Sequence, residues 1–289
     1  MTGNIAASVH ARLLNRAKAR SEEFNLVLTR YAIERFLYRL STLPMREKFC
    51  LKGALLFDLW FDIPHRPTHD ADFLGFGPQD AAALAATMGE ICGVDADDGM
   101  IFDAATITVE EIREEARYGG LRVRLTGMLG KARSTVQIDV GYGDAVSPSP
   151  EEAVYPVMLD DFPPPRLRVY PRATVIAEKL EAIVSLGMTN SRMKDFFDIR
   201  VLAREGKSDT TQVGDAIAAT FQRRGTPIPA GVPLGLSDEF AQDAVKRMQW
   251  LGFLRKNRLD ELALEDVIDD VRRFVEAPMA HARKVVARG

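Results

Sequence analysis

Two aspartates separated by one residue are the side chains of this sequence best placed to bind a metal ion. Asp70 and Asp72 flank Ala71 in a segment with strand character. In an extended strand, side chains two residues apart project from the same face, so the two carboxylates converge. Mg²⁺ takes hard oxygen ligands and completes its octahedron with water and substrate phosphates. The pair therefore indicates phosphate chemistry, although an isolated Asp-x-Asp is more often a solvated strand end.

A glycine turn precedes these two acids, and a third acid follows them much later. Gly53 is expected to let the backbone approach a phosphate closely. Asp139 lies where β-branched residues alternate with polar ones, so an adjacent strand can bring it beside Asp70 and Asp72. Three carboxylates repel one another without cations, and two Mg²⁺ ions with a nucleoside triphosphate resolve that repulsion. Alone, Asp139 also fits the solvated face of an antiparallel strand.

A lysine and two more acids lie on predicted helices in the second half of the chain. Lys179 flanks an apolar stripe, so it is expected to point inward and meet a phosphate as a point charge. Asp195 and Asp198 stand three residues apart, on one face of the next helix. The plainer interpretation is a solvated lysine and a pair of Lys194 with Asp198 worth about 0.2–0.5 kcal/mol. The joint order of the motifs favours the catalytic interpretation.

Composition and charge narrow the class of protein. The 289 residues are 46% hydrophobic, and their formal net charge of −3 creates no general attraction to nucleic acid or membranes. No apolar run reaches the roughly 18 residues of a membrane helix, and Cys50 and Cys92 lie in hydrophobic segments. We expect a cytoplasmic protein with reduced thiols and no membrane contact. An RNA path would need local arginines, which otherwise make ordinary surface contacts: Arg166, Arg168, Arg172, Arg192, Arg223 and Arg224.

The elements that must position these residues change in character along the chain. The first half predicts opening helices over 5–20 and 22–40, a strand, turn and helix around Gly53, the acidic strand, a helix from Pro78 to Cys92, and antiparallel strands near 107–109, 121–125 and 135–140. The proline-rich segment 147–165 is expected to be a loop or domain boundary. A short strand near 167–170 and helices over 174–186, 194–204, 211–222, 238–253 and 265–275 follow.

These patterns predict an α+β protein of two domains. Residues 1–165 would form a mixed sheet with flanking helices, and residues 166–289 a mainly α-helical C-terminal domain.

In their order, the motifs resemble those of the AbiEii/AbiGii toxin family, a branch of the polymerase-β-like nucleotidyltransferase superfamily. The resemblance covers most of the chain from about Phe49 to Arg204. In that family a Lys-Gly-Gly turn precedes an Arg, a Ser or Thr and an Asp-x-Asp, at the spacing found here in Lys52-Gly53-Ala54, Arg66, Thr68, Asp70 and Asp72. A later Ala-x-Lys-Leu helix and an Arg-Asp-x-x-Asp-like helix are matched by residues 177–182 and 192–199.

The resemblance implies a polymerase-β-like nucleotidyltransferase sheet and a C-terminal domain that completes the active site. It implies that Asp70 and Asp72 hold metal, that Lys179 contacts the triphosphate and that Asp195 is needed for activity; Asp139 is our own choice of third metal ligand. The cofactor would be Mg²⁺, with Mn²⁺ as a substitute. The residues assigned to nucleotide binding are Lys52, Gly53, Ala54, Arg66, Thr68, Lys179 and Asp198.

The function implied is that of a toxin-type nucleotidyltransferase of a toxin–antitoxin, or abortive infection, system. It would transfer a nucleoside monophosphate from an NTP to an acceptor, RNA and especially tRNA 3′ ends, with release of pyrophosphate. A cognate antitoxin encoded nearby and a role in growth arrest or phage defence follow from the same resemblance.

The family's turn is altered here at Ala54, where a glycine or serine is usual. The alanine keeps the backbone amide but offers no hydroxyl to a phosphate, which leaves a catalytically degenerate NTP-binding module open. A transferase that modifies protein instead of RNA is a further alternative. Thr68 supplies a hydroxyl near Asp70, as a nucleotide ligand, a site of modification or only a cap at the strand entry.

Overall fold

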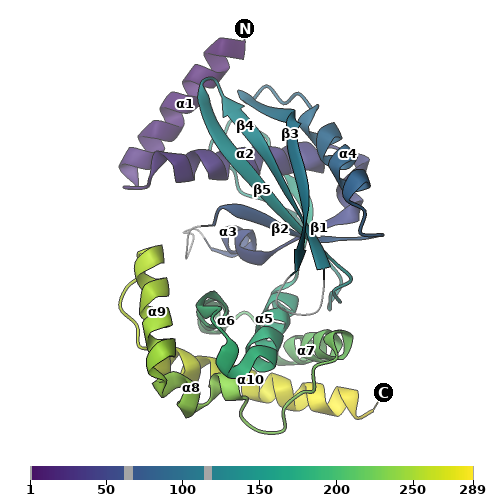
Figure 1. The fold of residues 1–289 in the computed structure, drawn as a ribbon, viewed down its shortest axis with the longest axis vertical. Helices are drawn as coiled ribbons and strands as arrows, with labels where there is room; N and C mark the ends of the chain where they lie inside the picture. Colours follow the sequence, from purple (N-terminus) through teal and green to yellow (C-terminus); the bar gives the residue numbers. More distant parts are fainter. Residues whose placement is uncertain (1, 62–67, 114–118, 289) are drawn as a thin grey trace. The chain divides into compact units, whose positions relative to one another are not determined.

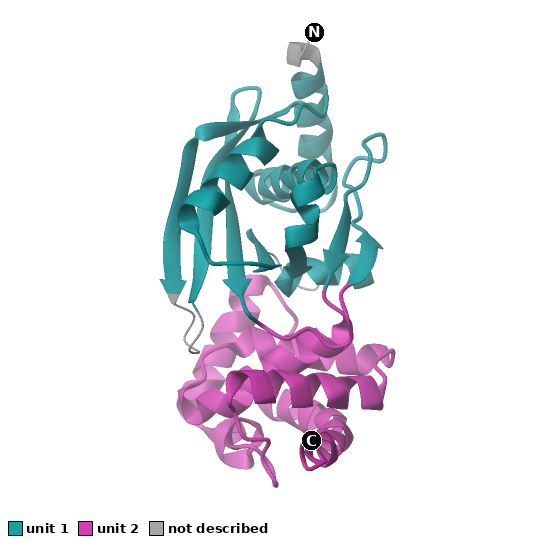
Figure 2. Ribbon diagram, turned by 90° about the vertical axis from the view of Figure 1, so that its right-hand side faces the viewer, with its two compact units in different colours: residues 1–143, 151–169 teal, residues 144–150, 170–289 magenta. Residues whose placement is uncertain are grey.

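The computed structural model describes residues 2–61, 68–113 and 119–288, and the chain forms two compact units (Figure 2). One unit consists of residues 1–143 and 151–169, and the other of residues 144–150 and 170–289. The domain boundary that we placed after residue 165 stays a prediction; in the structure, the strand Arg166–Val169 belongs with the sheet of the first unit.

The first unit is built on a mixed sheet of seven strands in the order β3-β4-β5-β2-β1-β7-β6 (Figure 1). The strands are β1 (Phe49–Lys52), β2 (Asp70–Gly75), β3 (Met100–Arg113), β4 (Gly119–Leu129), β5 (Ala132–Tyr142), β6 (Glu151–Val154) and β7 (Arg166–Val169). Strands β3, β4 and β5 are antiparallel neighbours, but β5 pairs with β2 in parallel, so the expected all-antiparallel addition is wrong there. Strand β6 lies inside the proline-rich segment that was expected to be loop.

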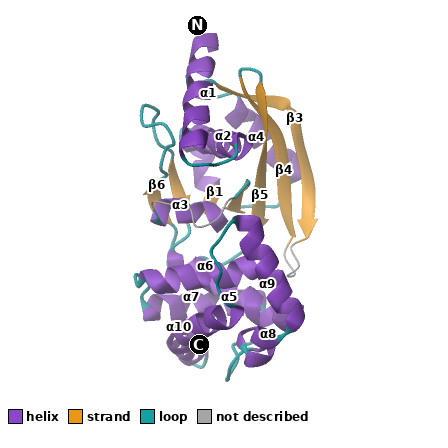
Figure 3. Ribbon diagram, turned by 90° about the vertical axis from the view of Figure 1, so that its left-hand side faces the viewer, coloured by secondary structure: helices purple, strands orange, loops and turns teal. Residues whose placement is uncertain are grey.

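Three helices cover one face of this sheet: α1 (Thr2–Ala19), α2 (Phe24–Ser41) and α4 (Ala81–Cys92) (Figure 3). A short helix, α3 (Leu56–Trp60), follows β1 through a tight 3₁₀ turn at Gly53–Leu55. Helix α4 begins later than expected, because the Asp80 side chain accepts hydrogen bonds from the first free amides, Ala82 and Ala83. Pro78 therefore lies before the helix.

Alternation along the strands separates a buried face from a partly exposed one. Val136, Ile138 and Val140 of β5 are fully buried, while Asp139 between them is partly exposed. The Ser134 hydroxyl, on the buried side of β5, shares a 2.8 Å hydrogen bond with Thr29 of α2. The helices therefore pack on the apolar side, as the two-residue period requires, and the acids line the opposite face.

The second unit is helical. It contains α5 (Arg172–Leu186), α6 (Met193–Glu205), α7 (Thr210–Arg224), α8 (Asp238–Gln242), α9 (Ala244–Asn257) and α10 (Leu264–Val286). The helix expected over 238–253 is two helices, because Asp243 takes an extended conformation and caps α9 through the Lys246 amide. Helix α10 continues well past 275 and through Pro278, whose neighbours Val275 and Met279 remain in its buried stripe. Neither cysteine forms a disulfide, and no helix in the described ranges is long and apolar enough to cross a bilayer.

Glu34 of α2 is a buried acid in the first unit, with a side chain only 2% exposed. Its Oε2 accepts a 2.6 Å hydrogen bond from the Met158 amide, and Arg35 Nε lies 3.0 Å from its Oε1. Burial raises the pKa of Glu34 to about 7, although Arg35 and the Met158 amide act in the opposite direction. The folded state therefore favours the protonated carboxyl.

Glu34→Gln should remove a pH-dependent loss of stability. The folded-state pKa lies above the ordinary value of 4.5, so the protonated form stabilises the fold fully below pH 4.5, and this contribution disappears as the pH rises through 7. Glutamine cannot ionise and still accepts from Met158. Urea unfolding at pH 5 and pH 8 measures the free energy of unfolding of both proteins. From pH 5 to pH 8, the free energy of unfolding of Glu34→Gln should rise relative to that of the parent protein by on the order of 3 kcal/mol. The control is Glu90→Gln, at an exposed position; parallel pH profiles for all three proteins would contradict the assignment.

Candidate active site

The three acids singled out in the first half of the chain meet on the partly exposed face of the sheet. Asp70 and Asp72 lie on β2, and Asp139 lies beside them on β5. One carboxylate oxygen from each residue lies within 4.8 Å of the others. Hard oxygen ligands grouped in this way suit Mg²⁺ or Mn²⁺, and the residues present therefore fit a divalent cation.

Strand register places two of the acids between two cations. Lys52 pairs with Asp72 across β1 and β2, Asp72 with Asp139 across β2 and β5, and Asp139 with Arg122 across β5 and β4. Side chains directly opposite on neighbouring strands share a face and interact. From β1 to β4 the row is therefore lysine, aspartate, aspartate, arginine, and Glu110 of β3 lies opposite the arginine.

Arg122 holds the third acid through both carboxylate oxygens. Its Nε lies 2.8 Å from Asp139 Oδ1 and its second terminal nitrogen 2.7 Å from Oδ2. This hydrogen-bonded pair raises the pKa of Arg122, partly offset by burial, and the charge of Asp70 adds to the rise. In this geometry Asp139 is shared between the acidic cluster and a guanidinium.

Position 53 requires glycine, because its backbone conformation and its closeness to the acidic cluster leave no room for a side chain. Its φ of +74° lies in the left-handed region, which favours glycine. A Cβ at this position would overlap the Asp72 carboxylate and lie 2.8 Å from its Cγ. The backbone of the turn therefore packs against a candidate metal ligand, and the tight turn expected from the sequence is present.

The other residues assigned to this half of the site surround the acids. The Thr68 hydroxyl, nearly buried, donates a 2.9 Å hydrogen bond to Asp70 Oδ1. Ala54 lies in the 3₁₀ turn directly after Gly53. Lys52 is 8% exposed and extends along the sheet toward Gly141, where a Cβ would stand 3.3 Å from its Nζ. Arg66 lies outside the described residues.

The lysine and acids of the second unit form their own cluster. Lys179 Nζ lies 2.8 Å from Asp195 Oδ1 and 2.9 Å from Asp198 Oδ2. Arg192 Nε approaches the other oxygen of Asp195 at 2.7 Å. Lys179 lies on α5, and both acids lie on α6, with Asp195 in its first turn, where the helix dipole favours an anion. The three residues expected on these two helices are therefore brought together.

Asp195 is fully buried yet charged. Burial alone would raise its pKa, but Lys179 and Arg192 outweigh that effect and hold the pKa of Asp195 well below its usual range. Its carboxylate is 0% exposed, so it acts through the two cations that it holds. The acids of the first unit and the lysine cluster belong to different units.

The arginines named as an RNA path are largely engaged with acids. Arg224 has a side chain 10% exposed and pairs with Asp144 at 3.0 Å and Glu181 at 2.8 Å, so for this residue the ion pairs favour the alternative of ordinary contacts over an RNA surface. Arg172 makes two 3.1 Å hydrogen bonds to Glu205. These charges are used inside the helical unit.

Arg122 was missed by the sequence analysis, although a signal for it existed. Strands β4 and β5 are joined by Gly130 and Lys131, and Gly130 has a φ of +59°. A two-residue hairpin turn fixes register, so counting outward equally from the turn places Arg122 opposite Asp139. The position of Asp139 beside β2 could not be counted this way, because that pairing is parallel and long-range.

The sheet order and the cluster of three acids define the class: an α+β protein with a polymerase-β-like nucleotidyltransferase sheet and a helical C-terminal part. The profile of the family described as "Nucleotidyl transferase AbiEii toxin, Type IV TA system" matches residues 35–277, which is more than half of the chain. The chain belongs to this family of toxin-type nucleotidyltransferases.

Two solved structures are similar to the chain. JHP933 from Helicobacter pylori has a TM-score of 0.47 and 16% identity, over 88% of this chain and 91% of its own. A second H. pylori protein, named as a candidate nucleotidyltransferase, has a TM-score of 0.46 and 15% identity, over 87% of this chain and 93% of its own. No curated protein matches the sequence at a significant level.

Gly53→Ala should weaken metal binding by at least about tenfold. The new Cβ would overlap the Asp72 carboxylate and force this ligand to move, in addition to about 1 kcal/mol of left-handed backbone strain. Mn²⁺ titration calorimetry measures the affinity. Gly206→Ala is the matched control, because Gly206 has a φ of +70° and open space around it. An unchanged Mn²⁺ affinity in Gly53→Ala would show that Asp72 is not a ligand.

Arg122→Gln should tighten binding of Mn²⁺ by about tenfold. A guanidinium that occupies both oxygens of Asp139 competes with a cation, and a tenfold change corresponds to about 1.4 kcal/mol. Arg124→Gln provides the control on the same strand, because Arg124 pairs with Glu110 instead. Equal or weaker Mn²⁺ affinity in Arg122→Gln would mean that Asp139 serves the arginine and not the metal.

Proposed function

We propose that the protein transfers a nucleoside monophosphate from an NTP to a hydroxyl of an RNA acceptor, with tRNA as the first class to test. The observation that carries this proposal is the convergence of Asp70, Asp72 and Asp139 on one sheet face, with Gly53 packed against it. Membership of the AbiEii family supports the transferase class. An acceptor hydroxyl and a triphosphate are the two reactants that this chemistry joins.

The reaction balances without a further reactant. The acceptor oxygen forms a bond to the α-phosphorus, the bond from that phosphorus to the bridging oxygen breaks, and pyrophosphate leaves. Two divalent cations would align the reacting oxygens and neutralise the charge that develops on them. Asp70 and Asp72 would hold these ions, and Asp139 would complete the ligand set or accept the hydroxyl proton.

The remaining residues have positioning roles in this proposal. Thr68 orients Asp70 through its hydrogen bond, and the Gly53 and Ala54 backbone offers amides to phosphate. Lys179 supplies positive charge to the triphosphate. Asp195 and Asp198 hold its ammonium in one place, so they act on the reaction through Lys179.

The family description also supports a partner and a physiological setting. We propose that a cognate antitoxin opposes this chain, and that unopposed transfer to RNA arrests growth. Addition of a nucleotide to an RNA 3′ end would explain such an arrest, because the original 3′ hydroxyl is then esterified to the added nucleotide and is no longer available for its normal reaction.

Asp70→Asn and Asp72→Asn should each reduce transfer at least about a thousandfold while leaving the fold intact, because each removes a charged metal ligand. The purified protein is incubated with total RNA, Mg²⁺ and each α-labelled NTP in turn, and labelled RNA is measured on a gel. Lys179→Met should slow transfer without weakening Mn²⁺ binding.

The control is Asp103→Asn, on β3 and outside the cluster, which should keep full activity. Undiminished transfer in Asp70→Asn would refute the assignment of the acids. Label in protein and not in RNA would identify a protein-modifying transferase, and nucleotide binding without pyrophosphate release would identify a degenerate module.

A further inference from the structure

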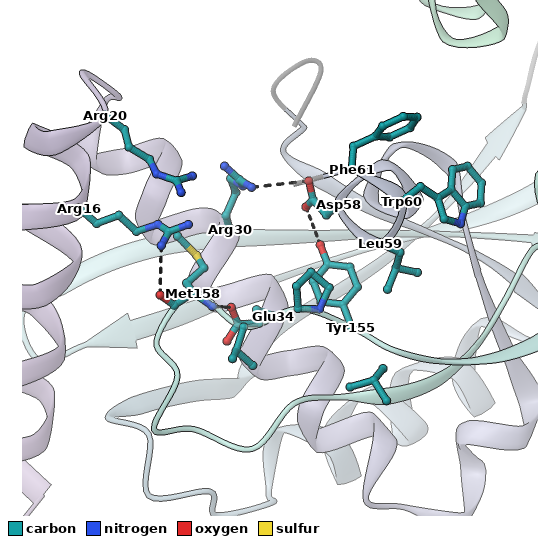
Figure 4. Close-up of a pocket in the computed structure, with 13 residues that line it drawn as sticks. Arg16, Arg20, Arg30, Glu34, Asp58, Leu59, Trp60, Phe61, Tyr155 and Met158 are labelled. Carbon is teal, nitrogen blue, oxygen red and sulfur yellow. Dashed lines mark hydrogen bonds and ion pairs between the residues drawn. The ribbon is translucent and has the colours of Figure 1, made fainter. Parts of the chain in front are cut away.

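A second cavity lies in the first unit, with no residue in common with the acidic cluster. It has a volume of about 360 Å³, which is the size range of small-ligand pockets (Figure 4). Helices α1, α2 and α3 and the segment 154–158 after β6 form its walls. Figure 4 shows three arginines on one side of the cavity and the aromatic side chains of α3 on the other.

Hydrogen bonds to the segment 154–158 hold the walls together. Arg16 donates to the Met158 carbonyl at 3.2 Å, and Glu34 accepts from the amide of the same residue. The Tyr155 hydroxyl donates to Asp58 of α3 at 2.7 Å (Figure 4). These bonds join three helices to one strand exit, so the cavity is pre-formed.

Asp58 of the cavity has its partners within the wall, Glu34 Oε1 has Arg35 Nε 3.0 Å away but makes no hydrogen bond with a described residue, and two of the arginines have donors to spare. Asp58 is held by Tyr155 and by Arg30, which lies 3.6 Å away. Arg16 Nε is buried and finds no hydrogen-bond partner within the described part of the chain. Arg20 is exposed at the cavity, and its guanidinium forms no ion pair with any described residue. The unused donors therefore belong to Arg16 and Arg20.

Positive charge is concentrated at this point. Burial lowers the pKa of Arg16, and the neighbouring charges of Arg20 and Arg30 lower it further. Cations crowded in this way, in a protein with a net charge of −3, favour an anionic ligand. Arginine is also the side chain best shaped to bind phosphate oxygens in pairs.

The opposite wall is apolar and aromatic. Trp60 and Phe61 are half-buried at the end of α3, and their ring centroids lie 5.5 Å and 5.9 Å from that of Phe57. Pro156 and Val157 extend the apolar surface. A planar base fits such a wall, because stacking on an aromatic side chain contributes about 1–3 kcal/mol per base.

We propose that this cavity is a binding site for a nucleoside monophosphate group, with its phosphate on Arg16 and Arg20 and its base against Trp60. The group comes either from one nucleotide of a single-stranded RNA or from a free mononucleotide. The RNA source rests on the proposed transfer to RNA, whereas binding itself requires no turnover. The cavity volume admits one nucleotide and excludes a duplex.

Fluorescence quenching of Trp60 tests the proposal in the full chain. The protein is titrated with AMP, with UMP and with a short single-stranded oligouridylate, in EDTA so that the acidic cluster holds no metal. The other tryptophan, Trp250, is 1% exposed and lies in the second unit. Trp60→Phe should abolish the signal but retain a ring for stacking, as equilibrium dialysis with labelled AMP would show.

Arg20→Ala should weaken nucleotide binding about tenfold, and Arg16→Gln with Arg20→Ala should weaken it further. Lys18→Ala removes the same charge in the last turn of α1, away from the cavity, and should change the affinity less than twofold. Thermal unfolding shows whether the variants keep their fold; Arg20 is exposed, so its replacement leaves the core unchanged.

Arginine-dependent binding of AMP identifies a free mononucleotide, and binding of the oligouridylate alone identifies the RNA strand. The proposal is overturned if neither ligand binds, if Arg20→Ala binds as well as the parent protein, or if inorganic phosphate competes as well as AMP. Failure of RNA labelling by the intact enzyme would refute the proposed transfer to RNA and leave these binding results standing.

Discussion

The first unit is organised around the electrostatic repulsion between neighbouring carboxylates. Asp72 and Asp139 are direct partners in a parallel strand pair, where like charges destabilise the sheet. In the same row, Lys52 lies opposite Asp72 and Arg122 lies opposite Asp139, so each of these acids has a cation beside it, and Glu110 of β3 lies on the far side of Arg122. Asp70 adds a third carboxylate, whose partner on β5 is the uncharged Gln137. The cations beside two of the acids reduce the repulsion, and the three carboxylates still form a group of oxygens that fits a divalent cation.

In the helical unit, the central charge is a lysine, which two carboxylates keep charged and in one position. Lys179 lies between Asp195 and Asp198, and Arg192 supplies a second cation to Asp195. Buried charges persist only with partners of this kind, because an unpaired one costs several kcal/mol of desolvation. In the proposed reaction, this arrangement would fix the ammonium before a phosphate binds, so less conformational entropy would be lost on binding. The phosphate would then have to compete with the two carboxylates.

The pattern of apolar and polar residues along a single strand was sufficient to predict which face of the strand each side chain occupies. The two-residue alternation placed Asp70 and Asp72 on one face of their strand. It placed Asp139 on the other face of its own strand from the buried Val136 and Ile138. The structure confirms both placements. Alternation does not name a strand's partner, so the parallel pairing of β2 with β5 was missed. The apolar periodicity also predicted one continuous helix where the structure has two. The extended Asp243 interrupts it, because its side chain caps the start of the second helix. The surrounding prolines led us to predict a loop in place of strand β6. This strand forms because it pairs with β7, and such pairing cannot be inferred from the local sequence.

One short segment links the two candidate sites of the first unit. Residues 53–61 begin with Gly53, whose backbone packs on Asp72, and continue into α3, which carries Asp58 and Trp60 to the second cavity. Gly53 cannot gain a side chain without moving a carboxylate, and Asp58 is tied to Tyr155 and Arg30. Both ends of the segment are therefore fixed by polar contacts, not by apolar burial alone.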